Sequence, residues 1–215
     1  LEELLTSKDL QDQVRAQGVR IKRNAEKLLH LVQELLQVQQ LSENAVKLCA
    51  TEQNLDSFIR QIIASFAPLS SSKRIAISYS NPTAVRKLWF DREQLERAFN
   101  NLISNALKFT GKHGRIVIST ELNNFGDHLL IRITDNGKGI HREHLNHVFD
   151  PFYQVEPGAG GSGIGLSLAK EIVTLHHGAI TVSSKADEGS SFTLRLPVGN
   201  EHLTAEEMCP AGVEA

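Results

Sequence analysis

Three short segments carry the side chains whose types and spacing could do chemistry. Asparagines and a lysine gather within Asn100–Phe109, and glycine-rich loops follow at Asp135–Ile140 and Gly161–Leu166. Together they supply a carboxylate, carboxamides, an ammonium group and backbone that glycine leaves accessible. Such groups can hold a purine, a metal ion and phosphates. The first interpretation is therefore a nucleoside-triphosphate site.

The asparagines and the lysine are expected to share one face of a helix. Asn101, Asn105 and Lys108 stand at positions i, i+4 and i+7, which are neighbours on a helix surface. Carboxamide oxygens are hard ligands suited to Mg²⁺, and a lysine ammonium can pair with phosphate as a point charge. The alternative is a set of solvated polar positions on an amphipathic helix. The two glycine loops favour the ligand-binding interpretation.

The first loop follows an alternating, strand-like segment. Asp135 ends that segment, and Gly137 and Gly139 allow the backbone to approach a ligand closely. A carboxylate here can accept a hydrogen bond from the exocyclic amine of adenine. Asp-Asn-Gly is also common turn chemistry, and for this loop taken alone the turn is the favoured interpretation.

The second loop leads directly into a helix. Gly163 and Gly165 therefore allow backbone N–H groups and the positive end of that helix to face a phosphate. The segment Gly158–Gly163 also fits the dinucleotide-binding fingerprint formally, but no strand precedes it and the match fails on context. The glycine-rich stretch Asp150–Gly163, with its aromatic residues, is instead typical of a mobile lid over a bound ligand.

A predicted set of helices and strands must position these segments. An Asp91–Gln94 capping box opens the Asn-rich helix, and the helix after the second loop is expected to end near His177 with Gly178 as its cap. Another helix, capped by Asp56, is expected to end near Pro68. Alternation predicts strands at Arg74–Tyr79, Arg115–Thr120, Leu129–Thr134, Ala179–Ser183 and Phe192–Leu196. This order predicts an α+β fold, a two-layer α/β sandwich with a mixed, mainly antiparallel sheet.

The N-terminal region has the pattern of a helical bundle. Apolar residues recur at alternating steps of four and three from about Val19 to Val46, which is heptad spacing. Leu1–Leu5 indicates the end of an earlier helix, with a break around Thr6–Asp9. A short α-helical hairpin cannot bury both faces of such stripes, so a dimeric four-helix bundle is expected. Packing of the hairpin on the rest of its own chain is the alternative.

Composition excludes several classes of protein. The 215 residues are 40% hydrophobic and 22% charged, ordinary values for a soluble globular protein of one or two domains. A formal net charge of -2 gives no bulk electrostatic case for nucleic acid or an anionic membrane. No apolar run approaches the roughly 20 residues that span a bilayer, and no signal peptide is visible. Cys49 and Cys209 are expected to be reduced thiols of a cytosolic protein.

The motifs occur in an order that resembles the ATP-binding domain of sensor histidine kinases. Asn101–Thr110 resembles the N box of that family, and Asp135–Ile140 and Gly161–Leu166 resemble its two G boxes. Val148–Tyr153 is similar to its F box, and Glu188–Phe192 is similar to its last glycine motif. The resemblance covers roughly residues 54–198. It implies the Bergerat ATP-binding fold, shared with gyrase, a heat-shock chaperone and mismatch-repair ATPases.

The resemblance implies ATP and Mg²⁺ as cofactors and assigns their contacts. Asn105 would bind the metal, with Asn101 as a second contact, and Lys108 would hold phosphate. Relatives that hydrolyse ATP carry a general-base Glu where this chain has Asn101, which cannot deprotonate water well. Asn101 and Lys108 are therefore the expected catalytic residues, for transfer to a protein acceptor. The implied binding residues are Asn101, Asn105, Lys108, Asp135, Gly137, Gly139, Ile140, Phe149, Phe152, Tyr153, Gly163, Ile164, Gly165, Leu166 and Ser191.

The helical region extends the resemblance but lacks one residue. Arg23–Gln40 resembles the second helix of the family's dimerisation and phosphotransfer domain, and Leu1–Leu5 resembles the end of the first. The acceptor His of that family, followed by an acidic residue and then a Pro, has no match among the nine His residues. We interpret these, including His176 and the His141–His147 cluster, as surface or structural. The acceptor is expected upstream of Leu1, so this fragment should bind ATP without autophosphorylating.

The implied organisation has three parts. Residues 1–50 form a partial dimerisation and histidine-phosphotransfer hairpin, residues 51–199 an ATP-binding catalytic domain, and residues 200–215 an acidic linker tail. The expected partners are a second copy, bound through the hairpin, and a response-regulator receiver domain, with no nucleic acid. The fragment is expected in the cytoplasm, and any anchor in the bacterial inner membrane would lie outside it.

The resulting hypothesis is the catalytic part of a sensor histidine kinase. It would bind Mg·ATP and pass the γ-phosphoryl group to a His on the dimerisation helix, for relay to a response-regulator Asp, mainly by positioning and charge neutralisation. One alternative is a degenerate, non-catalytic nucleotide-binding dimerisation module. Another is a protein serine kinase of the anti-sigma type or an ATPase clamp, against which the long helical region of Ile21–Val46 argues.

Overall fold

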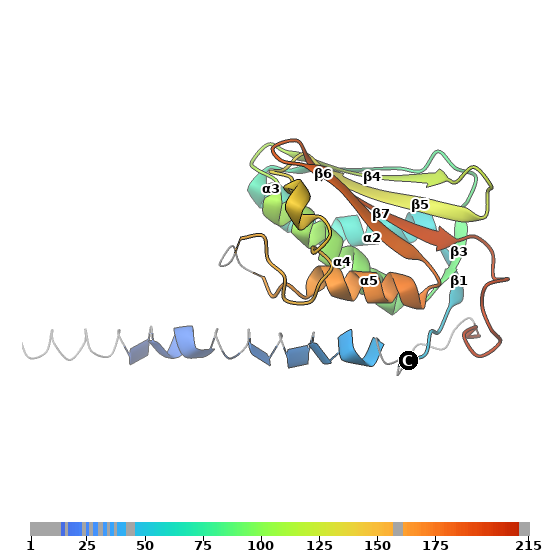
Figure 1. Cartoon of the computed structure of the whole chain (residues 1–215), viewed down its shortest axis with the longest axis horizontal. Coiled ribbons are helices and arrows are strands. Elements are labelled where there is room, and N and C mark those ends of the chain that lie inside the picture. Colours follow the sequence, from blue (N-terminus) through green and yellow to red (C-terminus); the bar gives the residue numbers. More distant parts are fainter. Residues whose placement is uncertain are drawn as a thin grey trace, which may run out of the picture.

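The computed structural model describes residues 14–15, 17–22, 25, 28–29, 32–33, 35–36, 38–41, 46–156 and 161–210. The described residues between 14 and 41 are helical, and this helical segment lies beneath a sandwich domain in the view of Figure 1. Val46 already lies in a bend, so the described helix ends before the predicted limit. The predicted earlier helix at Leu1–Leu5 and the break after it lie outside the described residues.

Five strands form the main sheet of the domain. In chain order they are β2 (Ala76–Ser80), β4 (Arg115–Leu122), β5 (His128–Asp135), β6 (Ala179–Lys185) and β7 (Gly189–Pro197). Their order across the sheet is β2-β4-β5-β7-β6. The β2–β4 pair is parallel, and the other three pairs are antiparallel. The prediction of a mixed, mainly antiparallel sheet is confirmed.

Helices form the second layer, on one side of this sheet (Figure 1). They are α2 (Leu55–Ser65), α3 (Ala67–Lys73), α4 (Arg92–Phe109) and α5 (Gly165–Leu175), with a short 3₁₀ turn, η1 (Arg142–His144). The predicted two-layer α/β sandwich is therefore confirmed. A small antiparallel sheet of β1 (Thr51–Asn54) and β3 (Lys87–Phe90), which the sequence did not reveal, accompanies it.

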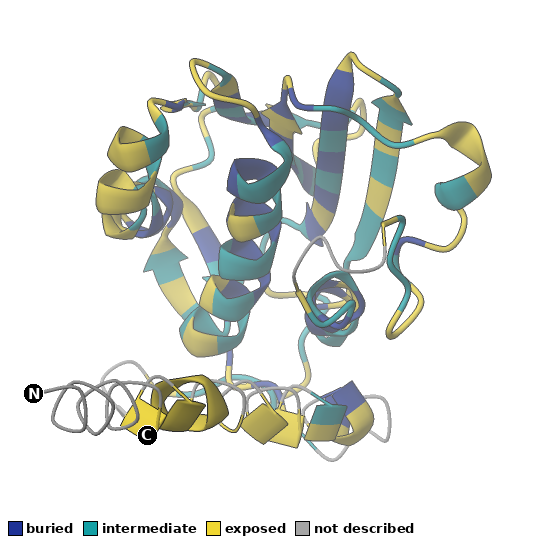
Figure 2. Cartoon of the chain, turned by 90° about the vertical axis from the view of Figure 1, so that its left-hand side faces the viewer, coloured by how far each residue is buried: buried dark blue, intermediate teal, exposed yellow. Residues whose placement is uncertain are grey.

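The core lies between the sheet and the helices, where buried residues face one another (Figure 2). The α4 helix buries one stripe of apolar residues, and β4 and β5 alternate buried and half-buried positions along their lengths. At the centre, the Phe58 ring lies 4.8 Å from the Phe90 ring and 5.6 Å from the Phe99 ring, measured between centroids. This packing fixes the rotation of α4 relative to the strands.

Two predicted helix ends are wrong in detail. The side chain that caps α2 is Asn54, which accepts a hydrogen bond from Ser57 N at 2.9 Å, whereas the Asp56 carboxylate accepts one from the Tyr79 hydroxyl at 2.7 Å. Pro68 does not end a helix. It stands in the first turn of α3, where proline costs no hydrogen bond.

The end of α5 also differs from the prediction. The left-handed residue at the end of α5 is His177, with φ of 56°, and not the predicted cap, Gly178. Gly178 instead donates its N–H to the Val173 carbonyl at 2.9 Å, as the residue after the left-handed position does in a Schellman motif.

The two cysteines form a disulfide, so the prediction of reduced thiols is wrong. The Cα atoms of Cys49 and Cys209 lie 5.3 Å apart. They meet because the C-terminal residues fold back on the start of the domain: Ala50 N donates to Glu207 O at 2.7 Å, and Cys209 N donates to Ala50 O at 2.9 Å. As far as residue 210, the tail is therefore held against the domain and does not extend as a linker.

Candidate functional site

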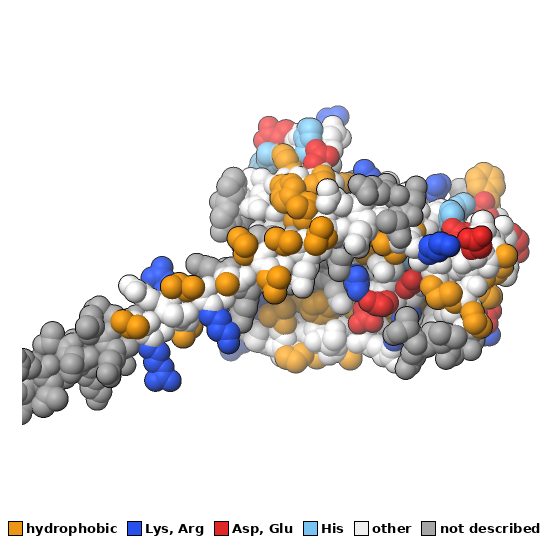
Figure 3. Space-filling model, turned by 90° about the horizontal axis from the view of Figure 1, so that it is seen from below, with side chains coloured by type: hydrophobic (Ala, Val, Ile, Leu, Met, Phe, Trp, Pro, Cys, Tyr) orange, Lys and Arg blue, Asp and Glu red, His pale blue; other side chains and the backbone are white. Residues whose placement is uncertain are grey.

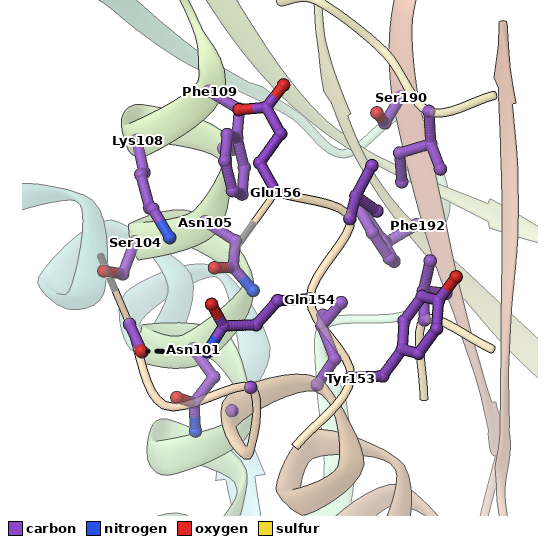
Figure 4. A pocket seen from close by; sticks show the side chains of 18 of the residues that line it. Asn101, Ser104, Asn105, Lys108, Phe109, Tyr153, Gln154, Glu156, Ser190 and Phe192 are labelled. Atoms are coloured by element: carbon purple, nitrogen blue, oxygen red, sulfur yellow. Dashed lines mark hydrogen bonds between the residues drawn. The ribbon is translucent and has the colours of Figure 1, made fainter. Parts of the chain in front are cut away.

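A cavity of about 750 Å³ opens between α4, the loop after β5 and the segment that leads to α5. This volume is within the range of small-molecule pockets, about 300–1,000 Å³. Figure 4 shows the α4 side chains facing the segment that carries Tyr153, Gln154 and Glu156. The cavity brings together ten of the predicted residues: Asn101, Asn105, Lys108, Asp135, Gly139, Ile140, Tyr153, Gly163, Gly165 and Leu166.

The α4 helix presents its polar face to the cavity. It begins at a side-chain cap, in which Asp91 Oδ1 accepts from Gln94 N at 3.1 Å. Since the buried stripe faces the core, Asn101, Asn105 and Lys108 line the cavity along the next face. Burial, followed by the neighbouring Lys138, lowers the pKa of the Lys108 ammonium, and Glu156 opposes this effect.

Asn101 lies where α4 meets the start of α5. Its Nδ2 donates to the Arg97 carbonyl at 3.0 Å. A Cβ atom on Gly165 would come within 2.7 Å of Asn101 Oδ1, so only glycine allows the first turn of α5 to approach this closely. The Asn101 oxygen thus lies beside the N-terminus of a helix, where backbone N–H groups favour an anion.

Asp135 is buried at the end of β5. Leu129, Ile131 and Ile133 turn into the core at every second position, and the same alternation carries Asp135 inward, where it is 6% exposed. One of its oxygens accepts from Gly137 N at 2.8 Å. Burial raises the pKa of the Asp135 carboxyl, while backbone hydrogen bonds from Gly137 and Ser190 act against this shift.

Two glycines allow the loop after β5 to pack against neighbouring backbone. Gly139 has φ of +67°, and a Cβ there would lie 2.0 Å from Lys185 O. A Cβ on Gly137 would lie 2.4 Å from Phe109 O. Gly139 lines the cavity and Gly137 does not. The structure therefore places Gly137 in the packing of the loop on α4, and its predicted contact with a ligand stays a prediction.

The aromatic residues of the predicted lid take different positions. Phe149 is half-buried, and its ring packs edge-on against Phe192, which lines the cavity, at 6.3 Å between centroids. Phe152 is 58% exposed, and its backbone N–H donates to Gly163 O at 3.0 Å. Phe152 therefore contacts the second glycine loop through its backbone, and its side chain does not line the cavity. Tyr153 lines the cavity.

Two further predicted binding residues, Ser191 and Ile164, do not line the cavity. Ser191 does not line the cavity, because β7 alternates and turns Ser190 and Phe192 toward it. The Ser191 hydroxyl pairs with Thr134 Oγ1 at 2.9 Å instead. Ile164 is fully buried at the start of α5 and supports the glycine loop from the core side.

Several residues that line the cavity are not among the predicted site residues, for example Phe109, Lys138 and Glu156. Lys138 Nζ pairs with Glu156 Oε2 at 2.6 Å and lies 4.8 Å from the centre of the Phe109 ring. Helical spacing was the signal for Phe109, which stands one turn beyond Asn105. No sequence spacing predicts the contact between Lys138 and Glu156, because this contact depends on how the two loops fold.

Within the described parts of the chain, no group of three or more His, Cys, Asp or Glu residues is arranged to hold a metal ion. None of the helices described here is long and apolar enough to cross a bilayer.

His176 is a structural residue, as interpreted: it is buried, and its Nε2 accepts from Asp91 N at 3.0 Å.

The sandwich and its cavity define a domain of the ATP-binding class. The sequence profile of the histidine kinase-, DNA gyrase B- and HSP90-like ATPases matches residues 90–200, a little over half of the chain. The chain belongs to this family.

Curated relatives are named as histidine kinases. Histidine kinase P4 from Formosa agariphila is 33% identical over 87% of this chain and 14% of its own length. The alginate biosynthesis sensor protein KinB from Pseudomonas aeruginosa is 34% identical over 80% of this chain and 29% of its own length. The chain thus spans less than a third of either relative.

Solved structures share the fold. Full-length ShkA in complex with AMPPNP superposes with a TM-score of 0.77, at 22% identity, over 86% of this chain and 39% of that chain. The nucleotide-free catalytic domain of histidine kinase ThkA gives a TM-score of 0.62 at 25% identity, over 69% of this chain and 95% of that chain. ThkA in complex with the response regulator TrrA gives 0.68 at 24% identity, over 85% of this chain and 51% of that chain.

Proposed function

We propose that this chain is the catalytic region of a sensor histidine kinase, which binds Mg·ATP and transfers the γ-phosphoryl group to a His on the dimerisation helix. A response-regulator Asp would then receive the phosphoryl group. The observation that carries the proposal is one cavity lined both by the Asn101, Asn105 and Lys108 face of α4 and by the buried Asp135. The relatives support it: ShkA was solved with AMPPNP, and ThkA with a response regulator.

The cavity has groups for each part of the nucleotide. The Asp135 carboxylate can accept a hydrogen bond from the adenine amine. Gly139, which also lines the cavity, has no side chain to cover the backbone there. Lys108 and the start of α5 at Gly165 supply positive charge and N–H groups for phosphates. These groups lie on different elements that meet only in the folded chain, which favours a ligand site over a chance turn at Asp135.

The donors available for a metal fit Mg²⁺. This ion keeps several waters and is held mainly by substrate phosphates, so one carboxamide oxygen, from Asn105, is a sufficient protein ligand. When bound, Mg²⁺ would neutralise charge on the phosphates and orient them. Asn101 stands where a hydrolase would need a general base, and its carboxamide cannot take a proton from water. We infer transfer to a protein acceptor in preference to rapid hydrolysis.

The organisation beyond this domain is also part of the proposal. Hydrophobic side chains occur along the described helical segment among Lys and Arg residues (Figure 3). We infer that this segment pairs with that of a second copy. We place the region in the cytoplasm, with any membrane anchor in segments outside these residues. Since none of the nine His residues has the acceptor's sequence context, we expect these 215 residues not to phosphorylate themselves.

Calorimetric titration with a non-hydrolysable ATP analogue, with and without Mg²⁺, tests the proposal. We expect metal-dependent binding in the micromolar range, about 8 kcal/mol. Absence of binding at millimolar analogue would reject the ATP site. Incubation with γ-labelled ATP tests the expectation that these residues do not phosphorylate themselves. Acid-labile label on this chain would contradict that expectation.

A further inference from the structure

The linker (residues 46–50) joins the helical segment to β1, and the tail (residues 200–210) returns to it from the far end of the chain. Figure 1 shows the tail, in red, descending from β7 toward the start of β1. Ala50 is fully buried and forms an isolated parallel bridge with Met208. Glu207 O accepts from Ala50 N, and Ala50 O accepts from Cys209 N. The tail thus adds a short strand along the linker.

The linker and the tail also contact the ends of α4 and α5, the two helices that line the cavity. Cys49 N donates to Asp91 Oδ2 at 3.3 Å, and Asp91 is the cap of α4. In the tail, Glu207 Oε1 lies 2.9 Å from His177 Nε2, just beyond the end of α5. The linker and the tail therefore meet where α4 begins and α5 ends, at the side of the domain from which the helical segment departs.

The disulfide is the only covalent bond between the linker and the tail, and it is open to reagents. It joins residues that are 160 positions apart in sequence. Cys49 is exposed and Cys209 is half-exposed, so a reagent can reach the bond. Without the bond, the tail would be held by two backbone hydrogen bonds to Ala50, the contacts of Glu207 and of the His202 ring with His177, and the exposed ion pair of Lys47 with Glu206. Such contacts hold a surface segment weakly, since segments with few buried contacts open locally at low cost.

We propose that Cys49 and Cys209 form a thiol–disulfide exchange site that fastens the tail across the linker, and that a dithiol reductant opens it. A thiolate of the dithiol attacks Sγ of the exposed Cys49 and displaces the Cys209 thiolate, forming a mixed disulfide. The second thiolate of the dithiol then releases Cys49. Two electrons pass to the protein, the dithiol becomes a disulfide, and its two protons go to the two cysteines.

The compartment proposed for this chain favours a reversible bond. Disulfides of proteins that work in a reducing compartment are usually transient and redox-sensing. If the chain acts in the cytoplasm, which rests on the proposed function, the oxidation state would set how freely the helical segment moves relative to the catalytic domain. The fastening of the tail itself does not depend on that function.

Amide hydrogen exchange of the 215-residue chain tests the proposal, in the oxidised form and after dithiothreitol. We expect exchange at Ala50 and Cys209 to become at least about tenfold faster on reduction, because their amides bond across the linker and tail. Amides in the middle of α4 should not change. The Cys49→Ser/Cys209→Ser double variant is the matched control, with fast exchange at Ala50 in both conditions.

Two results would overturn the proposal. One is unchanged exchange at Ala50 in a chain whose two thiols are shown by alkylation to be fully reduced. The other is failure of the reduced chain to regain the disulfide when treated with oxidised glutathione. Neither readout needs nucleotide, so failure of this proposal can be distinguished from failure of the proposed ATP site.

Discussion

The Asp135 carboxylate is buried at the end of β5, where backbone N–H groups hydrogen-bond to it. Asp135→Asn keeps the size of the side chain but removes the charge that would accept the adenine amine. Hydrogen bonds to charged groups contribute about 1.5–3 kcal/mol, so we expect the affinity for an ATP analogue to fall by roughly tenfold to a hundredfold. Calorimetric titration with the analogue would measure the affinities of the parent and the variant. The control is Asp127→Asn, the same change in an exposed hairpin; equal affinities of both variants would remove Asp135 from the site.

The raised pKa of Asp135 also predicts how stability depends on pH. Because burial raises this pKa above the ordinary 3.8, folding takes up a proton in the interval between the two values. Stability from this residue therefore falls as pH rises through that interval and is constant above it. We expect Asp135→Asn to lack this loss, so that it gains stability relative to the parent as pH rises from about 4 to about 7. Urea unfolding of both proteins across this range would show no such divergence if the carboxyl titrates normally.

Helical and strand periodicity decide which site residues the sequence could reveal. Spacing on one helix placed Asn101, Asn105 and Lys108 together, and the structure puts all three on the cavity wall. Strand alternation counted back from Phe192 turns Ser190 toward the cavity, and the predicted residue, Ser191, lies on the other face of β7. Contacts between loops, such as Lys138 with Glu156, follow no periodicity and could not be predicted.

At the scale of elements, the loop after β5 depends on a backbone conformation that favours glycine. Gly139→Ala would place a Cβ 2.0 Å from Lys185 O at φ of +67°. We expect a loss of about 1–3 kcal/mol in the free energy of unfolding, together with weaker nucleotide binding, because the loop must shift. Gly111→Ala is the matched control, since a Cβ there meets nothing within 4 Å. Urea unfolding would contradict the prediction if both variants were equally stable.

A buried histidine joins the start of α4 to the end of α5. His176 Nε2 accepts from Asp91 N, and its Nδ1–H donates to the Ile172 carbonyl at 2.7 Å, so the ring is neutral. Burial lowers the pKa of His176 below the ordinary 6.5. The stability that this junction contributes is therefore present above that value and is lost as pH falls through the lowered pKa.

His176→Gln tests this junction. At neutral pH we expect the free energy of unfolding of the variant to be about 1–3 kcal/mol below that of the parent, because a buried hydrogen bond is broken. When the pH falls from about 7 to about 5, we expect this free energy to fall less in the variant than in the parent. Urea unfolding at the two pH values measures both effects. The exposed His141→Gln is the control. A parent and a His176→Gln protein with the same pH dependence would show that this residue does not couple stability to protonation.

Most elements could be predicted from periodicity, and their ends could not. The five strands of the main sheet and helices α4 and α5 all follow clear patterns. Strands β1 and β3 have four residues each, too few for alternation to be recognised. The cap of α2 was misassigned because Asn54 and Asp56 are both good capping residues, and only the hydrogen bond to Ser57 distinguishes them.

At the scale of the whole molecule, long-range contacts were hidden from the sequence. Cys49 and Cys209 are separated by 160 positions, and two cysteines so far apart in a sequence without metal-type spacing favoured reduced thiols. They meet because β7 ends on the same side of the domain as the linker, which is a property of topology. The acidic composition of residues 200–215 likewise indicated a linker, whereas Glu207 is in fact one of the residues that hold the tail down.

The helical segment divides into two parts with different surroundings. Val38 and Leu41 are buried and belong to the core of the domain, so packing on the same chain accounts for that end. Nearer the N-terminus the apolar side chains face solvent, with Ile21 68% exposed and Leu28 65% exposed. Since helical stripes of this kind are stabilised by burial against other helices, we expect the second part to form the contact between two copies.

Charge on the exposed part tests this division. In an Ile21→Glu/Leu28→Glu double variant, each copy would bring two carboxylates into the helix contact. Each of the replaced side chains contributes about 1.5–3 kcal/mol when buried, and twofold symmetry counts both changes twice. We therefore expect sedimentation velocity to show a dimer for the parent and a monomer for the double variant. Affinity for the ATP analogue should not change, because neither residue lines the cavity. Gln33→Glu adds charge at an exposed polar position of the same segment and should leave the dimer intact; a double variant that sediments like the parent would place the dimer contact elsewhere.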